Sequence, residues 1–161
     1  MSLDIHWESK SFNELSNNEL YDALKLRIDV FVVEQTCYYP DLDDKDRHPN
    51  TIHLLGYKYS PSSEKKLAAY ARILPKGQTY NDYISIGRVI TAPFARGLGL
   101  GHKLMQKALL VCHKIFSHQN IKISAQEHLE KYYGQYGFVR ASEMYLEDDI
   151  PHIAMIKKVS K

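Results

Sequence analysis

The chain has 161 residues, of which 44% are hydrophobic and 25% charged, with 21 basic against 19 acidic residues. This composition is typical of a soluble globular protein, and the length predicts a single domain over residues 1–161 whose core needs no disulfide or metal. Because the charges nearly balance and no dense basic run occurs, we expect no nucleic-acid partner. No segment approaches the roughly 20 apolar residues of a membrane span, so we expect no membrane partner either.

Two further features indicate a cytoplasmic protein. Cys37 and Cys112 are far apart in the chain and lack metal-ligand spacing. This pattern favours free thiols in a reducing compartment and predicts no metal site. The first residues include Asp4 and Glu8 and have no apolar core, which is not the pattern of a signal peptide.

The first helix is predicted over residues 17–31. Ser16 followed by Glu19 is a capping box, in which each side chain bonds the backbone N–H of the other residue. Helical spacing then continues along an apolar stripe, formed by Leu20, Leu24, Ile28 and Phe31.

Two or three antiparallel strands are expected after this helix. An acidic segment over residues 37–50 is predicted to be a loop. Residues rich in β-formers then predict strands at 52–59, 67–74 and 83–91, the last closed by Pro93. Because their connections are short, we expect neighbouring strands to be antiparallel.

A glycine-rich turn separates the third strand from a second helix. Its residues are Arg96, Gly97, Leu98, Gly99, Leu100 and Gly101. A strand followed by glycines and a helix start is suited to binding phosphate, because the first helical N–H groups are unpaired and glycine lets the backbone approach an anion. The spacing matches neither a Walker P-loop nor a dinucleotide fingerprint. A plain tight turn is the alternative interpretation.

The remainder of the chain alternates between helices and strands. The second helix is marked by Leu104, Ala108, Val111 and Ile115. A strand at 121–125, a short helix at 129–136 and two more strands around Pro151 are expected to follow. This order of elements predicts a mixed α/β or α+β sheet protein.

Two motifs resemble those of the GCN5-related N-acetyltransferase (GNAT) family, whose first motif binds the pyrophosphate of acetyl-CoA. They are Arg96-x-x-Gly99-x-Gly101 and Tyr133-x-x-x-Gly137-Phe138. Other segments resemble the ElaA-like subgroup of predicted acyltransferases and extend the resemblance over most of the chain. These segments are residues 30–35, 69–73, 86–90 and 150–152.

The resemblance implies a fold and an activity. The implied fold is a mixed, mostly antiparallel sheet of roughly six or seven strands flanked by about four helices, with a splayed strand pair that holds acyl-CoA. The implied activity is direct transfer of an acetyl group from acetyl-CoA, as co-substrate, to an amine of a small molecule or peptide. A homodimer is also implied, because dimers are frequent in this family.

The resemblance also implies the residues of the site. Tyr133 matches the tyrosine that serves the family as general acid beside the departing thiolate. Gln126 occupies a position where the family often has asparagine, which weakens its assignment as a coenzyme contact. The full set of expected coenzyme-binding residues is Val89, Ile90, Thr91, Arg96, Gly97, Leu98, Gly99, Leu100, Gly101, His102, Gln126 and Tyr133.

The general base is the least defined part of this prediction. Many family members carry a glutamate on the fourth strand, but residues 84–91 contain no acid. Glu34 and His152 are the catalytic candidates, and Glu127 and His128 are further possibilities, since a histidine exchanges protons near neutral pH. Each could equally be a surface or structural residue.

The acids of this chain could attract a cationic acceptor such as a polyamine. Our preferred interpretation is that the acids lie in solvated turns, and that Arg27 and Arg88 form ordinary salt bridges. The acids concerned are Asp41, Asp43, Asp44, Asp46, Glu147, Asp148 and Asp149.

Two other functions stay open at this point. The chain could be a non-catalytic module that binds or senses acyl-CoA, which the missing strand acid favours and the retained Tyr133 opposes. It could also be an acyltransferase with a longer acyl donor, similar to the acyl-homoserine-lactone synthases. The preferred donor chain length would separate that enzyme from an acetyltransferase.

Overall fold

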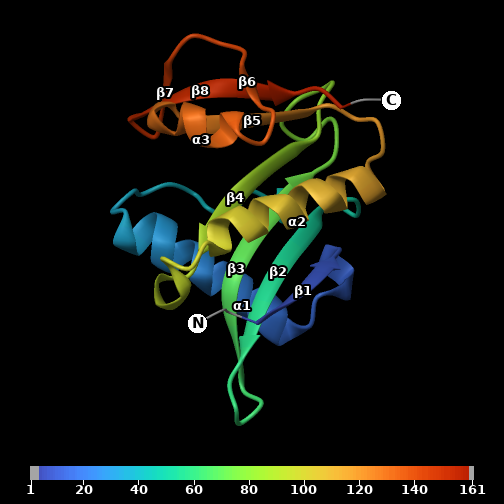
Figure 1. Cartoon of the computed structure of the whole chain (residues 1–161), viewed down its shortest axis with the longest axis vertical. Helices are drawn as coiled ribbons and strands as arrows, with labels where there is room; N and C mark the ends of the chain where they lie inside the picture. The colour runs from blue at the N-terminus through green and yellow to red at the C-terminus, as the bar shows by residue number, and fades with distance from the viewer. Residues whose placement is uncertain (1–3, 160–161) are drawn as a thin grey trace.

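The computed structural model describes residues 4–159, which form two antiparallel sheets (Figure 1). The first sheet has the strand order β1-β2-β3-β4, and its strands span Ile5–Lys10, Ile52–Tyr59, Lys65–Leu74 and Ser85–Thr91. The second has β8 (Ile150–Lys157) between β5 (Ile121–Gln126) and β6 (Val139–Arg140), and β7 (Tyr145–Glu147) also pairs with β8. The expected sheet class is confirmed, with strands additional to those implied.

The two sheets meet where β4 and β5 begin. Ile84 and Ile121 form a parallel bridge, in which the N–H of Ile84 donates to Asn120 O at 3.2 Å and the N–H of Lys122 donates to Ile84 O at 2.9 Å. Beyond that bridge, no strand pairing joins β4 to β5 within residues 4–159. This is the expected splayed pair, and it leaves one edge of β4 with unpaired backbone groups.

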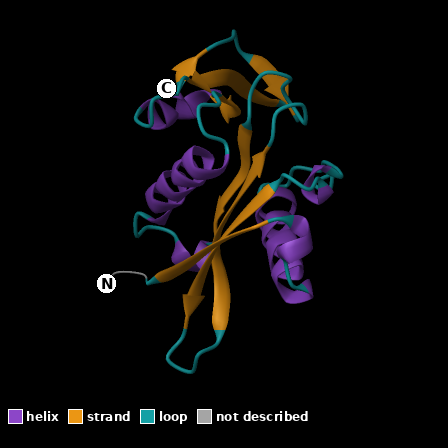
Figure 2. Cartoon of the chain, turned by 90° about the vertical axis from the view of Figure 1, so that its right-hand side faces the viewer, coloured by secondary structure: helices purple, strands orange, loops and turns teal. Residues whose placement is uncertain are grey.

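Helices cover both faces of the first sheet (Figure 2). Helix α1 packs on one face and α2 on the other, and each lies over its own cluster of buried apolar side chains. None of the helices within residues 4–159 has the length and apolarity that crossing a bilayer requires. The α-helices are α1 (Asn17–Arg27), α2 (Leu100–Ile115) and α3 (Glu130–Gly134).

Within residues 4–159, the other helical segments are one π-helix and several short 3-10 helices. A π-helix, η2 (Ile28–Glu34), continues α1. The short 3-10 turns are η1 (Phe12–Glu14), η3 (Lys45–Arg47), η4 (Pro93–Ala95) and η5 (Glu127–Leu129).

Helix α1 begins where the sequence predicts, but the face that it buries differs from the predicted one. The capping box is confirmed, because the N–H of Glu19 donates to Ser16 Oγ at 3.1 Å and the N–H of Ser16 donates to Glu19 Oε1 at 2.8 Å. The predicted apolar stripe is only half-buried, however. The buried face of α1 lies one position away, on Glu19, Ala23, Leu26 and Arg27.

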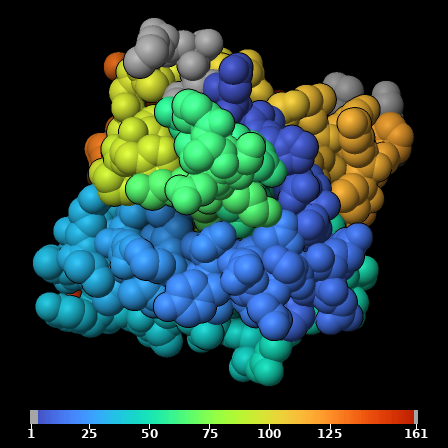
Figure 3. Space-filling view, turned by 90° about the horizontal axis from the view of Figure 1, so that it is seen from below, coloured from blue at the N-terminus to red at the C-terminus, as the bar shows by residue number. Residues whose placement is uncertain are grey.

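Strand β1 was not predicted, although its residues alternate weakly. Trp7 lies opposite Gly56 of β2, and a Cβ on Gly56 would approach the Trp7 ring to within 2.7 Å. The absent side chain on one strand therefore makes room for the indole on its neighbour. Seen from below (Figure 3), the N-terminal segments in blue form a continuous face, with the β2–β3 hairpin tip, in green, projecting toward the viewer.

Candidate active site

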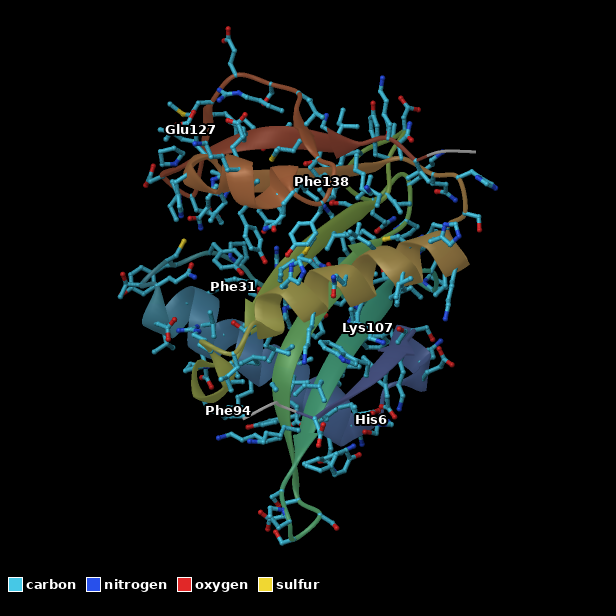
Figure 4. The ribbon with its side chains drawn as sticks, in the orientation of Figure 1. His6, Phe31, Phe94, Lys107, Glu127 and Phe138 are labelled. Atoms are coloured by element: carbon cyan, nitrogen blue, oxygen red, sulfur yellow. The ribbon has the colours of Figure 1, made fainter. Side chains whose placement is uncertain are left out.

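A cavity of about 520 Å³ occupies the opening between the splayed strands β4 and β5. Its walls come from segments far apart in the chain: β4, β5, η2 with the loop after it, α3 and the β7–β8 turn. Figure 4 labels Phe31 of η2, which lines this cavity, and Glu127, whose neighbour Gln126 lines it. The predicted site residues on its wall are Val89, Gln126, Tyr133 and His152.

The glycine-rich turn has the backbone geometry expected of a phosphate cradle. Gly97 and Gly99 have φ values of +86° and +73°, in the left-handed region that favours glycine. Helix α2 begins at Leu100, directly after Gly99. Its first N–H groups, from Leu100 to His102, therefore lack helical acceptors and gather at the positive end of the helix dipole.

Arg96 is held beside this turn by two partners. Its Nε donates to Thr91 O at 3.3 Å, and its Nη2 lies 2.9 Å from Glu34 Oε1. Glu34 therefore lies next to the phosphate cradle and is not among the residues that line the cavity. This position gives Glu34 a candidate role different from the predicted base, because its carboxylate would compete with a bound phosphate for Arg96.

The His102 side chain points to a neighbouring aromatic group rather than offering itself to a ligand. Its Nδ1 lies 2.7 Å from the hydroxyl of Tyr136, and its Nε2 lies 3.1 Å from the amide of Gln106. The expected coenzyme contact of His102 thus falls to its backbone N–H. The same hydrogen-bonded group ties the start of α2 to the chain just after α3.

Of the three tyrosines near the second motif, Tyr133 is the one that lines the cavity. Its ring packs edge-to-face against Tyr132 and Phe138, with centroid distances of 5.1 and 6.3 Å. Burial, with a smaller contribution from Tyr132, raises the pKa of Tyr133 to about 12. The phenol is therefore protonated at neutral pH and can donate a hydrogen bond into the cavity.

His152 lies on β8 opposite Gln126 of β5, and it is 8% exposed. Its Nδ1 lies 2.7 Å from the backbone oxygen of Ile150. Because a carbonyl oxygen only accepts, Nδ1 carries a proton in this contact, and the neutral ring has its lone pair on Nε2. Nε2 lies 3.4 Å from Glu147 Oε2. The other candidate bases, Glu127 and His128, do not line the cavity.

Strand β4 contributes backbone groups next to a bulge. The pairing of β3 with β4 shifts register between Tyr70 and Arg72, and Arg88 has a φ of +50°. A non-glycine residue in that region is strained and needs support from its surroundings. N–H groups of consecutive strand residues point to opposite edges, so one of Val89 and Ile90 directs its amide to the open edge of β4.

A cluster of buried charges supports this bulge. We call it the arginine–aspartate cluster, and its contacts join α1, β3, β4, η3 and the loop before η3. Arg27 Nε donates to Asp41 Oδ2 at 2.9 Å, and Arg88 Nε donates to Asp41 Oδ1 at 2.9 Å. The members of the cluster are Arg27, Arg72, Arg88, Asp41, Asp43 and Asp46.

The interpretation of the acidic loop as a solvated turn is wrong for three of its four acids. Asp41 and Asp46 are buried, Asp43 is half-buried, and only Asp44 is exposed. Burial alone would raise the pKa of Asp43, but the hydrogen bonds and charge of Arg72 outweigh it and lower the pKa to about 2. Asp43 therefore stays ionised at neutral pH. The prediction that Arg27 and Arg88 form salt bridges is confirmed.

Sequence reasoning missed several residues that line the cavity. Arg72 and Lys45 are the charged ones, and Cys37, Tyr39 and Ser124 are others. A signal for Arg72 does exist, because it is a charge inside an otherwise apolar strand, and a buried charge needs partners. The aspartates two and three positions apart in the loop are the matching signal.

Comparisons with known proteins agree with this geometry. Residues 52–159 match the model of an acetyltransferase (GNAT) domain. The fold, the glycine-rich turn and the splayed strands thus define an acyltransferase of this class, and the chain belongs to the GNAT family. It is 41% identical to the protein ElaA of Escherichia coli over 155 residues, which cover 96% of this chain and 97% of ElaA.

Solved structures give the same result. An acyl-CoA N-acyltransferase from Pseudomonas aeruginosa superposes with a TM-score of 0.88 at 42% identity, over 96% of this chain and 99% of the other. The structure of Escherichia coli ElaA superposes with a TM-score of 0.85 at 39% identity, over 96% of this chain and all of that one.

Proposed function

We propose that this chain transfers the acetyl group of acetyl-CoA directly to the amine of a small molecule or peptide. The observation that carries the proposal is a single cavity, at the open edge of β4, whose wall holds both Tyr133 and His152. The phosphate cradle of residues 96–102 follows β4 after the short turn η4. A coenzyme bound at the cradle can therefore extend its thioester into the cavity.

The pantetheine arm is proposed to lie along β4 as an additional strand. The edge of β4 that faces β5 has unpaired backbone groups after the bridge at Ile84, and such groups bind an extended amide chain readily. The inward N–H of Val89 or Ile90 would then donate to the thioester oxygen. That bond strengthens as negative charge develops on the oxygen, which lowers the barrier.

Proton transfer is assigned to His152. An amine attacks a thioester only in its neutral form, so the acceptor ammonium must first lose one proton. His152 Nε2, whose ring is oriented by the bond of Nδ1 to Ile150 O at 2.7 Å, would take this proton. The carboxylate of Glu147, 3.4 Å from Nε2, would stabilise the imidazolium that results.

Tyr133 is proposed to stabilise the leaving sulfur by a hydrogen bond. The amine nitrogen bonds the acyl carbon, the C–S bond breaks, and its electron pair leaves with the sulfur as a thiolate. A thiol has a pKa of about 8.5, well below that of a buried phenol, so complete proton transfer from Tyr133 would be unfavourable. The proton lost by the attacking nitrogen reaches the thiolate afterwards.

A cytoplasmic location and a homodimer are further parts of the proposal. Cys37 and Cys112 are free thiols in the structure, which supports a reducing compartment. The dimer rests on the family resemblance alone, and sedimentation of the purified chain tests it.

The test measures coenzyme A release with a thiol reagent while acetyl-CoA is offered to a panel of amines. Tyr133→Phe is expected to lower kcat by about 100-fold with acetyl-CoA binding retained, whereas Tyr132→Phe, which alters a ring outside the cavity lining, has little effect. Binding without turnover on any amine favours the sensing module. Faster turnover of long-chain thioesters favours the alternative donor.

An isosteric pair tests the phosphate cradle separately. Gly99→Asp and Gly99→Asn both introduce side chains that tolerate positive φ and cap helices well, so both proteins should fold. The extra carboxylate repels the pyrophosphate, and we expect acetyl-CoA to bind the Asp variant about tenfold more weakly than the Asn variant. Equal affinities would contradict phosphate binding at this helix start.

A further inference from the structure

One wall of the cavity carries a lysine without a carboxylate partner. Lys45 lies at the start of η3, lines the cavity and donates through Nζ to the hydroxyl of Thr79 at 3.0 Å. Among the described residues 4–159, no carboxylate lies within ion-pair distance of this ammonium group. Its charge is therefore free to act on a ligand.

Arg88, on the same wall, offers a second donor. Its Nε and Nη2 donate to Asp41, at 2.9 Å from Oδ1 and from the backbone oxygen, and Nη2 also donates to Asp43 Oδ2 at 3.4 Å, while Nη1 has no partner within residues 4–159. The guanidinium lies over the ring of Tyr39, 5.3 Å from its centroid. These contacts hold the side chain in one orientation, so an anion reaching Nη1 finds a preorganised donor.

This wall has a net positive charge, because the charges of the arginine–aspartate cluster cancel and Lys45 has no acidic partner in the described part of the chain. Three arginines and three aspartates of the arginine–aspartate cluster cancel, which leaves Lys45 as the excess charge. Asp41, Asp43 and Asp46 of the acidic loop are paired with arginines in this cluster. These three acids therefore give no support to a polyamine acceptor.

The other wall of the cavity is acidic. Glu147 and Asp148 line it from the β7–β8 turn, and Glu147 is half exposed and lies beside His152. No lysine or arginine is paired with either carboxylate within residues 4–159. The two walls thus have opposite signs: a net positive charge at Lys45, with Arg88 Nη1 as a further donor, and negative charge next to the proposed base.

We propose that the acceptor is a zwitterion, an amino acid whose amine is acylated and whose carboxylate is bound by Lys45 and Arg88. Its ammonium group would enter beside Glu147 and Asp148, lose a proton to His152 and attack the thioester. This inference rests on the proposed function for the reaction and adds the acceptor's chemical class. A charge-assisted hydrogen bond at each end would fix the orientation of so small a substrate.

The experiment compares L-amino acids with the matching carboxamides, which keep the amine and the side chain but lose the negative charge. With the wild-type chain we expect the KM of the preferred amino acid to be at least about tenfold below that of its carboxamide. Lys45→Gln should remove most of this difference by raising the KM of the acid alone. Lys107→Gln, on the exposed face of α2 (Figure 4), is the matched control and should change neither.

Binding to the coenzyme-loaded protein, measured by calorimetry, separates the two proposals. A preference for the acid that Lys45→Gln abolishes supports the acceptor class even when no turnover occurs, and in that case the proposed reaction fails alone. Equal binding and equal KM for acid and carboxamide overturn the acceptor class while turnover sustains the reaction. Lys45→Glu should reverse the preference, and an unchanged preference in that variant would also overturn it.

Discussion

The two ends of the active-site cavity are built by different physical means. The coenzyme end is one continuous stretch, residues 96–102, which would bind its ligand mostly through backbone N–H groups at the start of α2. The acceptor end is assembled from side chains of η2, η3, β3, β4 and β8, whose positions depend on the arginine–aspartate cluster. Backbone recognition tolerates many sequences, whereas side-chain recognition changes with each substitution. Acceptor choice is therefore expected to diverge faster than coenzyme binding.

Removing the central arginine of the arginine–aspartate cluster tests whether the acceptor end depends on this cluster, and it has the largest expected effect. Arg27 has no exposed surface, and Arg27→Leu removes one of the two arginine partners of Asp41 and of Asp46, which leaves the buried cluster with an excess negative charge. An uncompensated buried charge costs about 3–5 kcal/mol, and we expect urea denaturation to show a loss of that size. Lys25→Leu, which breaks the exposed pair with Asp29, is the control and should cost less than about 1 kcal/mol. Similar losses in both variants would show that the cluster does not organise the fold.

Low pH should reduce the free energy of unfolding by protonating Asp43, which lies at the acceptor end. Its folded-state pKa of about 2 lies below the ordinary value of about 3.9. A depressed pKa adds stability above the unfolded value, and this stability is lost as the pH falls from about 4 toward 2. We expect a loss of about 2 kcal/mol across that window, measured by denaturation at each pH. In Asp43→Asn, which has no carboxyl group, the slope should shrink, and an identical slope would contradict the assignment.

The smallest expected effect concerns an ion pair that connects the acceptor end of the cavity to the coenzyme end. Glu34 of η2 pairs with Arg96 of the cradle at 2.9 Å, and both side chains are substantially exposed. Removing the competing carboxylate by Glu34→Gln should tighten acetyl-CoA binding by about two- to fivefold, with the gain shrinking as salt is added. Glu130→Gln, which loses a comparable exposed pair with Arg140, should leave the affinity unchanged. Weaker binding in Glu34→Gln would mean that the carboxylate orients Arg96 rather than competing for it.

The parts of the site that could be predicted are those whose causes are local. Gly97 and Gly99 need positive φ because of the turn in which they lie, and the helix start that they precede follows them directly. The capping box of α1 was predictable for the same reason. In contrast, the partners of Asp41 lie 14 and 47 positions away, at Arg27 and Arg88. Only the folded chain brings such charges together, which is why the acidic loop was misinterpreted.

Two other features differ from the sequence prediction because tertiary contacts determine them. The buried face of α1 carries Arg27 because the cluster satisfies its charge, so hydrophobic spacing alone pointed to the wrong face. Strand β1 alternates only weakly, and its place in the sheet depends on the space that Gly56 leaves for Trp7. In both cases a tertiary partner decides the outcome, and local propensity does not reveal that partner.

The single bridge between Ile84 and Ile121 makes the two sheets one interrupted structure. A coenzyme arm lying along β4 would fill the interruption, so that the donor would take the place of a missing strand during each turnover. The free energy of unfolding would then rise with thioester concentration and fall when the product departs. The two sheets would then be continuous only while the donor is bound.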